Sequence, residues 1–232
     1  MNPLKLQSNE QYFDIWAQTY DTQLNPLVAL EDRFLRELLP DIRGKRVLDV
    51  GCGTGRWLKY FAERGPADSL HGIDPSAAML LSASQKNISG VSLLQCPCDA
   101  TPFSVNTFDL IISSFVLSYV EDVHRMAKEI DRTAQNGCDF FLSDMHPETQ
   151  HTLNWKRSFQ SSRGKIKLDS ARHGLADIVA TFCSFGWNVR AMIEPEFGPP
   201  EREIFVAAGR LDYFIEANGF PAIYILHLRK GE

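Results

Sequence analysis

One stretch of the sequence constrains the fold more than any other. Val47-Leu48-Asp49-Val50 is an apolar run interrupted by a single acid, and Gly51-Cys52-Gly53-Thr54-Gly55 follows it directly. The run predicts a buried strand over 46–50, and the glycines predict a tight turn into a helix over 54–64, because glycine accepts positive φ and lets a ligand approach the backbone. In this arrangement a nucleotide-like ligand meets the N-terminus of a helix.

The spacing of the glycines narrows the kind of ligand. A dinucleotide site needs G-x-G-x-x-G, and its third glycine would fall on Arg56. A second acid, Asp74, ends the next apolar run over 69–73, where a carboxylate can accept hydrogen bonds from both hydroxyls of a ribose. Each feature alone has an ordinary interpretation, a tight turn or a helix cap. Strand, turn, helix, strand and acid within about thirty residues are typical of one βαβ unit.

Asp49 and the spacing Gly51-x-Gly53-x-Gly55 resemble the first motif of class I S-adenosylmethionine-dependent methyltransferases. The resemblance implies S-adenosylmethionine as cofactor, S-adenosylhomocysteine as product, and contact between Asp49 and the ammonium group of the cofactor. It also implies that Asp99 faces the adenine, and that the run 108–113 is the family's fourth motif. The residues expected to contact the cofactor are Tyr20, Asp49, Gly51, Cys52, Gly53, Gly55, Asp74, Pro75, Met79, Asp99, Ala100, Ser113, Ser114 and Phe115.

Apolar runs and helical patterns alternate along the chain, which predicts an α/β fold with a parallel sheet and crossover helices. The resemblance implies a Rossmann-like three-layer sandwich with a seven-stranded, mostly parallel sheet of order 3-2-1-4-5-7-6, whose last strand is antiparallel. At 232 residues a single domain is expected. We divide 1–232 into a helical cap (1–44), a cofactor-binding core (45–143), an acceptor-site cover (144–170) and C-terminal helices and strands (171–232).

Several further elements follow from turn and capping signals. Asp74 is expected to cap a helix that begins at Pro75, and Asn136-Gly137 is expected to close a helix over about 121–134. The segment 146–168 has no clean period, and long connections of this type are often lids or binding segments. The remaining predictions are strands over 91–96, 138–143, 188–193 and 222–228, and helices over 171–185 and 205–217.

Aromatic residues recur at helical spacing over 12–21, and the aperiodic segment 146–168 carries Trp155 and Phe159. They either pack on the core or line an acceptor pocket, and the residues expected to face the acceptor are Tyr12, Trp16, Tyr119, His151 and Trp155. His146 follows the fifth predicted strand and is the candidate general base, although a histidine in such a loop is more often an ordinary polar residue. A carboxylate acceptor would need no base and would favour a cationic clamp, for which Arg157 or Arg163 could serve.

Composition and net charge narrow the kinds of molecule that this protein is expected to bind. The net charge of -5 argues mildly against a nucleic-acid backbone, and the basic cluster within 156–167 is either a solvated face or a phosphate contact. Five cysteines without C-x-x-C spacing indicate reduced thiols and a cytoplasmic protein, and no signal peptide or membrane span is predicted. Asp144 has no evident partners, so no metal is expected. We therefore expect a small-molecule acceptor and a monomer or homodimer; a protein or RNA substrate, or a non-catalytic cofactor-binding module, are the alternatives.

Overall fold

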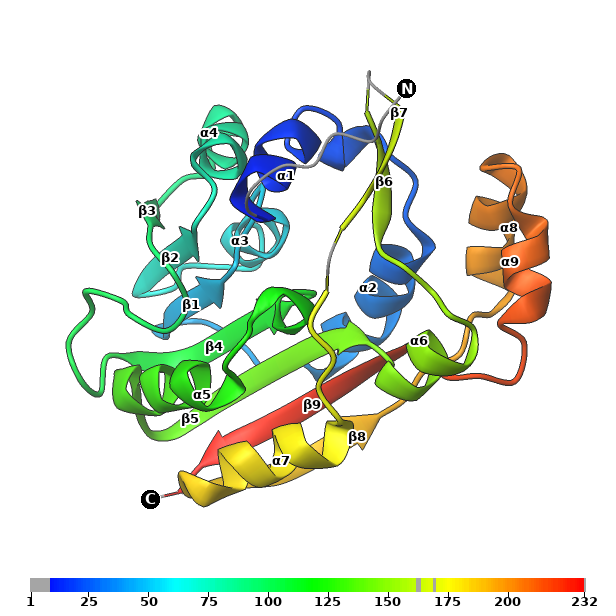
Figure 1. The fold of residues 1–232 in the computed structure, drawn as a ribbon. Helices are drawn as coiled ribbons and strands as arrows, with labels where there is room; N and C mark the ends of the chain where they lie inside the picture. The colour runs from blue at the N-terminus through cyan, green and yellow to red at the C-terminus, as the bar shows by residue number, and fades with distance from the viewer. Residues whose placement is uncertain (1–8, 162–163, 169, 232) are drawn as a thin grey trace.

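The protein has a three-layer α/β architecture (Figure 1) in the computed structural model, which describes residues 9–161, 164–168 and 170–231. One sheet has the order β3-β2-β1-β4-β5-β9-β8, and β6 pairs with β7 in a separate hairpin. Strands β1 to β5 pair in parallel, and β9 runs antiparallel to both of its neighbours. Counted without the hairpin, this is the order 3-2-1-4-5-7-6, and the prediction is confirmed. The strands are β1 (Arg46–Val50), β2 (Ser69–Asp74), β3 (Val91–Gln95), β4 (Phe108–Ser114), β5 (Ala134–Met145), β6 (Ser158–Ser161), β7 (Gly164–Lys167), β8 (Trp187–Ile193) and β9 (Ile223–Lys230).

The register of the parallel strands brings several polar residues to one edge of the sheet. Val50 pairs with Ile73 of β2 and with Ser113 of β4, and Ser114 pairs with Ser143 of β5. The glycine turn after β1, the acid that ends β2 and the end of β4 therefore lie side by side at the carboxyl edge. Ligands bind at this edge in open α/β sheets.

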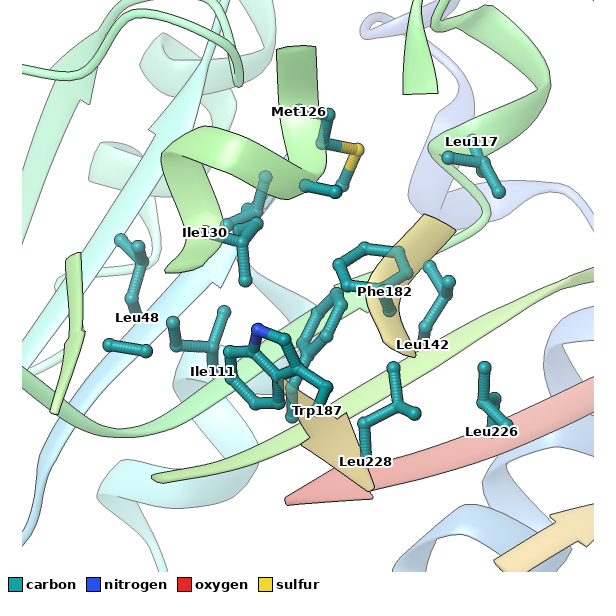
Figure 2. Close-up of a cluster of buried hydrophobic side chains, with 14 of the residues drawn as sticks. Leu48, Ile111, Leu117, Met126, Ile130, Leu142, Phe182, Trp187, Leu226 and Leu228 are labelled. Carbon is teal, nitrogen blue, oxygen red and sulfur yellow. The ribbon is translucent and has the colours of Figure 1, made fainter. Parts of the chain in front are cut away.

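Helices cover both faces of the sheet (Figure 1). Helices α2 (Pro26–Leu38) and α3 (Arg56–Ala62) pack on one face, and α5 (Val123–Thr133) and α7 (Leu175–Ser184) pack on the other. Helix α4 (Ala77–Gln85) follows β2 and contacts β2 and β3. Figure 2 shows the core under α5 and α7, where Ile130 and Phe182 meet Trp187 and the sheet residues. Each fully buried side chain of this size contributes roughly 1.5–3 kcal/mol.

A third, smaller apolar cluster lies above the carboxyl edge. Helix α1 (Asn9–Trp16) supplies Trp16 to it, and the β6–β7 hairpin supplies Phe159. Their rings stack with centroids 4.9 Å apart and planes 8° from parallel. The predicted aperiodic segment 146–168 thus contains two regular elements, α6 (Pro147–Thr152) and this hairpin. Helix α1 and the hairpin hold each other over the end of the sheet, with a 3-10 turn, η1 (Tyr20–Thr22), beside them.

The prediction of a single helix over 205–217 is wrong. Two helices occupy this region, α8 (Pro199–Ala207) and α9 (Leu211–Glu216). The first begins early because Pro199 suits a first helical turn and Glu201 accepts a hydrogen bond from the Gly198 amide at 2.8 Å. Gly209, at φ +64, then changes the direction of the chain between the two helices. Both helices belong to one insertion between β8 and β9, and Glu201 pairs with Arg33 of α2 at 2.8 Å.

Other predicted boundaries also need correction. Ser76, and not Asp74, caps α4, because its hydroxyl accepts from the Met79 amide at 3.1 Å. Asn136-Gly137 does not close a helix: α5 ends at Thr133, and β5 already pairs with β4 at Ala134 across a bulge. The helix predicted over 171–185 begins later, at Leu175. Among the helices of the described residues, none has the length and apolar character needed to cross a bilayer.

Candidate functional site

The glycine turn after β1 has the geometry that its spacing predicts. Gly51, Gly53 and Gly55 have φ values of +70, +53 and +80, a region that other residues rarely adopt. A Cβ atom on Gly51 would lie 2.3 Å from Cγ2 of Val116, so this position has no room for a side chain. A Cβ on Gly53 would meet nothing within 4 Å. The turn is thus packed on the Gly51 side and open on the Gly53 side.

Asp49 is a buried carboxylate with one free oxygen. Its exposed fraction is 2%, and Oδ2 has no hydrogen-bond partner among the described residues. Burial raises the pKa of Asp49 to about 8. The positive charge of Arg56 lowers this pKa, whereas the negative charges of Asp74 and Glu31 raise it further. A buried carboxylate without a partner is unfavourable. A bound ammonium group would supply the missing partner.

Asp74 accepts hydrogen bonds from the turn, and its carboxylate can still accept hydrogen bonds from a ligand. Its Oδ2 accepts from the Gly53 amide and its Oδ1 from the Ser76 amide, both at 2.9 Å. Burial raises the pKa of this carboxyl above its usual range. Each carboxylate oxygen has a second lone pair, so the two oxygens can still accept from a pair of vicinal hydroxyls. The residues present therefore fit an adenosyl cofactor with an ammonium group at its other end.

Among the other residues predicted to contact the cofactor, those that end β4 lie near the turn. The Ser113 hydroxyl is buried and has no partner within the described part of the chain. Ser114 donates to Glu31 at 2.7 Å. Phe115 has φ +57, a strained value for an aromatic residue, and such outliers cluster at ligand sites.

The remaining predicted residues surround this group. The side chain of Cys52 packs against Gly72, and its thiol donates to the Gly53 carbonyl at 3.8 Å. Asp99, expected at the adenine, forms an ion pair with Arg125 at 2.9 Å, and Ala100 beside it is exposed. Met79 is buried at the start of α4, and the Pro75 carbonyl accepts from the Gln95 amide group at 2.9 Å.

A charged network that the sequence analysis did not anticipate ties the N-terminal helices to the turn. Arg56, where a dinucleotide fingerprint would have glycine, donates to Glu31, to Asp32 and to Ser114. The Thr54 hydroxyl donates to Asp21 of η1 at 2.7 Å. The only sequence signal for this network was the arginine itself. As a result, α2 and η1 are fixed over the glycine turn.

A cleft of about 1200 Å³ lies next to the turn. Trp16, Tyr20 and Arg56 line the part contributed by α1, η1 and α3. Phe197, Phe205 and Tyr213 line the wall formed by the β8–β9 insertion. Trp16 and Trp155, which are predicted to contact the acceptor, line this cleft. The predicted Tyr12 and Tyr119 pack in the hairpin cluster instead, and His151 is exposed and does not line the cleft. No histidine lines the described part of the cleft wall.

Arg157 enters the cleft at the carboxyl end of β5. Its guanidinium donates to Asp144 and to the Ser118 hydroxyl, the latter at 3.1 Å. It also lies over the rings of Tyr119 and Phe115, 5.0 and 5.7 Å from their centroids. Arg163, the other candidate clamp, lies outside the described residues.

His146 follows β5 but does not face the cleft. Its Nε2 lies 2.7 Å from Oε1 of Glu194, at the end of edge strand β8, and the side chain is buried. Its Nδ1 is buried and has no hydrogen-bond partner among the described residues, and His146 does not line the cleft. Within the described ranges, no three His, Cys, Asp or Glu side chains converge in a way that could hold a metal ion.

Comparison with known proteins agrees with the geometry of the turn. The family model of a methyltransferase domain matches residues 47–137, which include the glycine turn, Asp74 and the end of β4. The chain belongs to the class I S-adenosylmethionine-dependent methyltransferases. It is an enzyme of this type, and S-adenosylmethionine is its cofactor.

Two relatives in sequence extend beyond this core. An uncharacterized protein of Haemophilus influenzae is 31% identical over 74% of this chain and 71% of its own length. A malonyl-[acyl-carrier protein] O-methyltransferase of Halorhodospira halophila is 28% identical over 76% of this chain and 63% of its own length. The present chain thus spans less than two thirds of the length of this second relative.

Solved structures show the same fold. An S-adenosylmethionine-dependent methyltransferase from Mesorhizobium loti superposes on 89% of this chain and 100% of its own, with a TM-score of 0.70 and 21% identity. At this identity the likeness concerns the fold alone.

Proposed function

We propose that this methyltransferase transfers the methyl group of S-adenosylmethionine to a small molecule bound in the cleft. The observation that carries the proposal is the position of the cleft, which shares Tyr20 and Arg56 with the surroundings of the glycine turn. Its volume of about 1200 Å³ exceeds the few hundred to ~1,000 Å³ typical of small-molecule sites, which leaves room for an extended acceptor. The Halorhodospira relative, named for an acyl group on a carrier protein, supports an acceptor of this kind.

We assign the cofactor to the turn. Asp49 would pair with the ammonium group, Asp74 would accept from the ribose hydroxyls, and the open side of Gly53 would admit the ligand close to the backbone. When bound, the cofactor supplies an activated methyl group on a sulfonium, which leaves as a neutral thioether. The task of the protein is then to hold donor and acceptor in line, and positioning alone can lower a barrier by ~7–11 kcal/mol.

The side chains near the cleft fit positioning better than proton transfer. Burial raises the pKa of Tyr20 to about 12, so its phenol stays protonated at neutral pH. His146 is paired with Glu194 outside the cleft. The stacked Trp16 and Phe159 cover the sheet edge and exclude water from it. We therefore base the mechanism on binding, alignment and dehydration, and place the whole chain, 1–232, in one methyltransferase unit.

The test uses methyl-labelled S-adenosylmethionine with the enzyme, a metabolite extract, and separate protein and RNA fractions. Label in a discrete small metabolite supports the proposal and identifies the product by mass. Label on an amino-acid side chain of a protein, label in RNA, or label in no fraction with the cofactor bound, contradicts it. Asp74→Ala serves as the inactive control, because losing charge-assisted contacts of about 1.5–3 kcal/mol each weakens cofactor binding tenfold or more. Asp68→Ala, at an exposed aspartate before β2, is the matched control and should bind normally.

A further inference from the structure

The guanidinium of Arg157 is a buried cation with an unused donor. Its side chain is only 8% exposed, yet Nε has no hydrogen-bond partner among the described residues. Nη2 donates to Asp144 and to Ser118, and Nη1 donates to the Tyr119 hydroxyl at 3.4 Å. Nε itself is closed off from solvent, so a ligand in the cleft that Arg157 lines would reach the guanidinium through Nη1, whose contact with the Tyr119 hydroxyl is long for a hydrogen bond.

The position of Arg157 favours the acceptor over the cofactor. Its anchor, Asp144, ends β5, and β4 separates this strand from β1 and the glycine turn. At roughly 4.8 Å per strand, the anchor lies about 10 Å from the turn. The guanidinium lines the large cleft and is held between Asp144 and the rings of Phe115 and Tyr119. It is therefore fixed in orientation before any ligand arrives.

The charge of Arg157 is only partly cancelled by Asp144. The Asp144 carboxylate also accepts from the Ser118 amide at 2.8 Å and the Met145 amide at 2.7 Å. Two backbone donors thus share that negative charge, and the guanidinium retains positive potential toward the cleft. Arg56, the other arginine near this end, is already engaged by Glu31 and Asp32. Arg157 is thus the better placed of these two arginines to receive an anion.

One wall of the cleft is suited to an apolar body, although polar residues such as Asp21, Asp212 and Glu216 also line it. The side chains that line it from Met145 to the insertion include Trp155, Phe197, Ile204 and Phe205. Lys156 and Lys167 also line the cleft, but both are exposed to solvent. A ligand that contacts both Arg157 and this apolar wall would carry one planar anionic group and an apolar body.

We propose that the acceptor is an apolar carboxylic acid whose carboxylate is bound by Arg157. The proposal rests on the function proposed above and names the substrate class of the same cleft. An arginine suits this task because its planar fork matches a carboxylate. The methyl group would then be delivered to an acceptor held at one end by this contact and at the other by the wall of α8 and α9.

The test measures binding and needs no turnover. The protein is loaded with S-adenosylhomocysteine, and calorimetry compares 4-phenylbutyrate with its neutral amide. The wild type should bind the carboxylate at least tenfold more tightly than the amide. Arg157→Gln should abolish this preference, and Lys156→Gln, at the exposed neighbouring cation, should retain it. Because Arg157→Gln leaves Asp144 buried without its partner, Asp144→Asn/Arg157→Gln is measured as well, and it should also show no preference.

Three results would overturn the proposal. The first is equal affinity of the wild type for the two probes, or no binding of the carboxylate up to its solubility limit. The second is a carboxylate preference that persists without Arg157. The third is a tenfold loss of S-adenosylhomocysteine affinity in the double variant, which would assign the arginine to the cofactor. Failure of the proposed function would show in the labelling experiment and not in this binding measurement.

Discussion

Arg56, the first residue of α3, donates to the fully buried carboxylate of Glu31 in α2. The same carboxylate accepts from Ser114 of β4 and from Ser143 of β5. One acid thus joins a helix of the N-terminal cap to the start of the turn helix and to the carboxyl edge of two strands. Its removal should affect both the fold and the cofactor site.

Glu31→Gln should lower the free energy of unfolding by about 3 kcal/mol, because it breaks a buried ion pair and leaves Arg56 with Asp32 as its one remaining carboxylate partner among the described residues. Urea denaturation measures the change. Glu37→Gln, at an exposed position of the same helix, is the control and should change stability by less than about 0.5 kcal/mol. An equal effect of the two substitutions would show that the Glu31 network contributes nothing specific.

Asp49 should make cofactor affinity depend on pH. Burial raises its pKa to about 8 in the free protein, and the ionised form is the partner for an ammonium group. As the pH falls below 8, more of the carboxyl is protonated, so affinity should decline toward pH 6. Calorimetric titration across this range tests the expectation, and Asp49→Asn should bind weakly without this slope. A wild-type affinity that stays constant from pH 6 to pH 8 would contradict the assignment.

The same carboxyl should destabilise the ligand-free protein at high pH. Between its usual pKa near 4 and about 8, the folded state binds more protons than the unfolded state, so stability falls as pH rises. Asp49→Asn removes this effect and should raise the Tm at pH 9. One pKa unit is worth about 1.4 kcal/mol, which corresponds to roughly 3–6 °C for a chain of this size. An unchanged or lower Tm at pH 9 would argue against a buried ionised Asp49.

The stack between Trp16 and Phe159 should control access to the sheet edge. Phe159→Ala removes the ring that holds the hairpin on α1. Hydrogen exchange should then become faster in α1 and in β6, with little change in β1 or β4, because the cluster is separate from the main core. Phe214→Ala, in α9 and outside this cluster, is the control. Faster exchange spread evenly over the sheet would mean that the cover is part of the main cooperative unit.

His146→Gln should leave the turnover number within about twofold of wild type, because the imidazole is paired with Glu194 and not with the cleft. Glu194→Gln is the matched variant and should behave in the same way. Steady-state kinetics with the acceptor found by labelling decides the question. A loss of about 10² or more in turnover for His146→Gln alone, at unchanged cofactor affinity, would return the histidine to the role of general base.

The sheet and the glycine turn could be predicted because local sequence determines them. A buried apolar run, glycines at positions that require positive φ and an acid after the next strand each carry their signal within a few residues. The charged network could not be predicted in this way. Nothing near Glu31 indicates that it will meet Arg56, Ser114 and Ser143, which lie 25 to 112 positions away and converge only in the folded sheet.

The sequence also could not predict which way a side chain points. His146 was expected at the ligand edge because it follows β5, and its backbone does lie there. The residue that decides its role, Glu194, comes from the end of edge strand β8, so the pairing depends on β9 lying between β5 and β8. The helix break at Gly209 was missed for a simpler reason, since the apolar pattern over 205–217 continues across it.

The insertion that carries α8 and α9 joins two antiparallel neighbours, β8 and β9, which a short turn could connect. The sheet therefore does not depend on its length or sequence, whereas one wall of the cleft consists of it. Mutations here that spare the buried Glu201, which pairs with Arg33, can accumulate with little penalty to folding, while the shape offered to the acceptor changes. Laboratory evolution toward new acceptors would do best to randomise this segment and leave the glycine turn untouched.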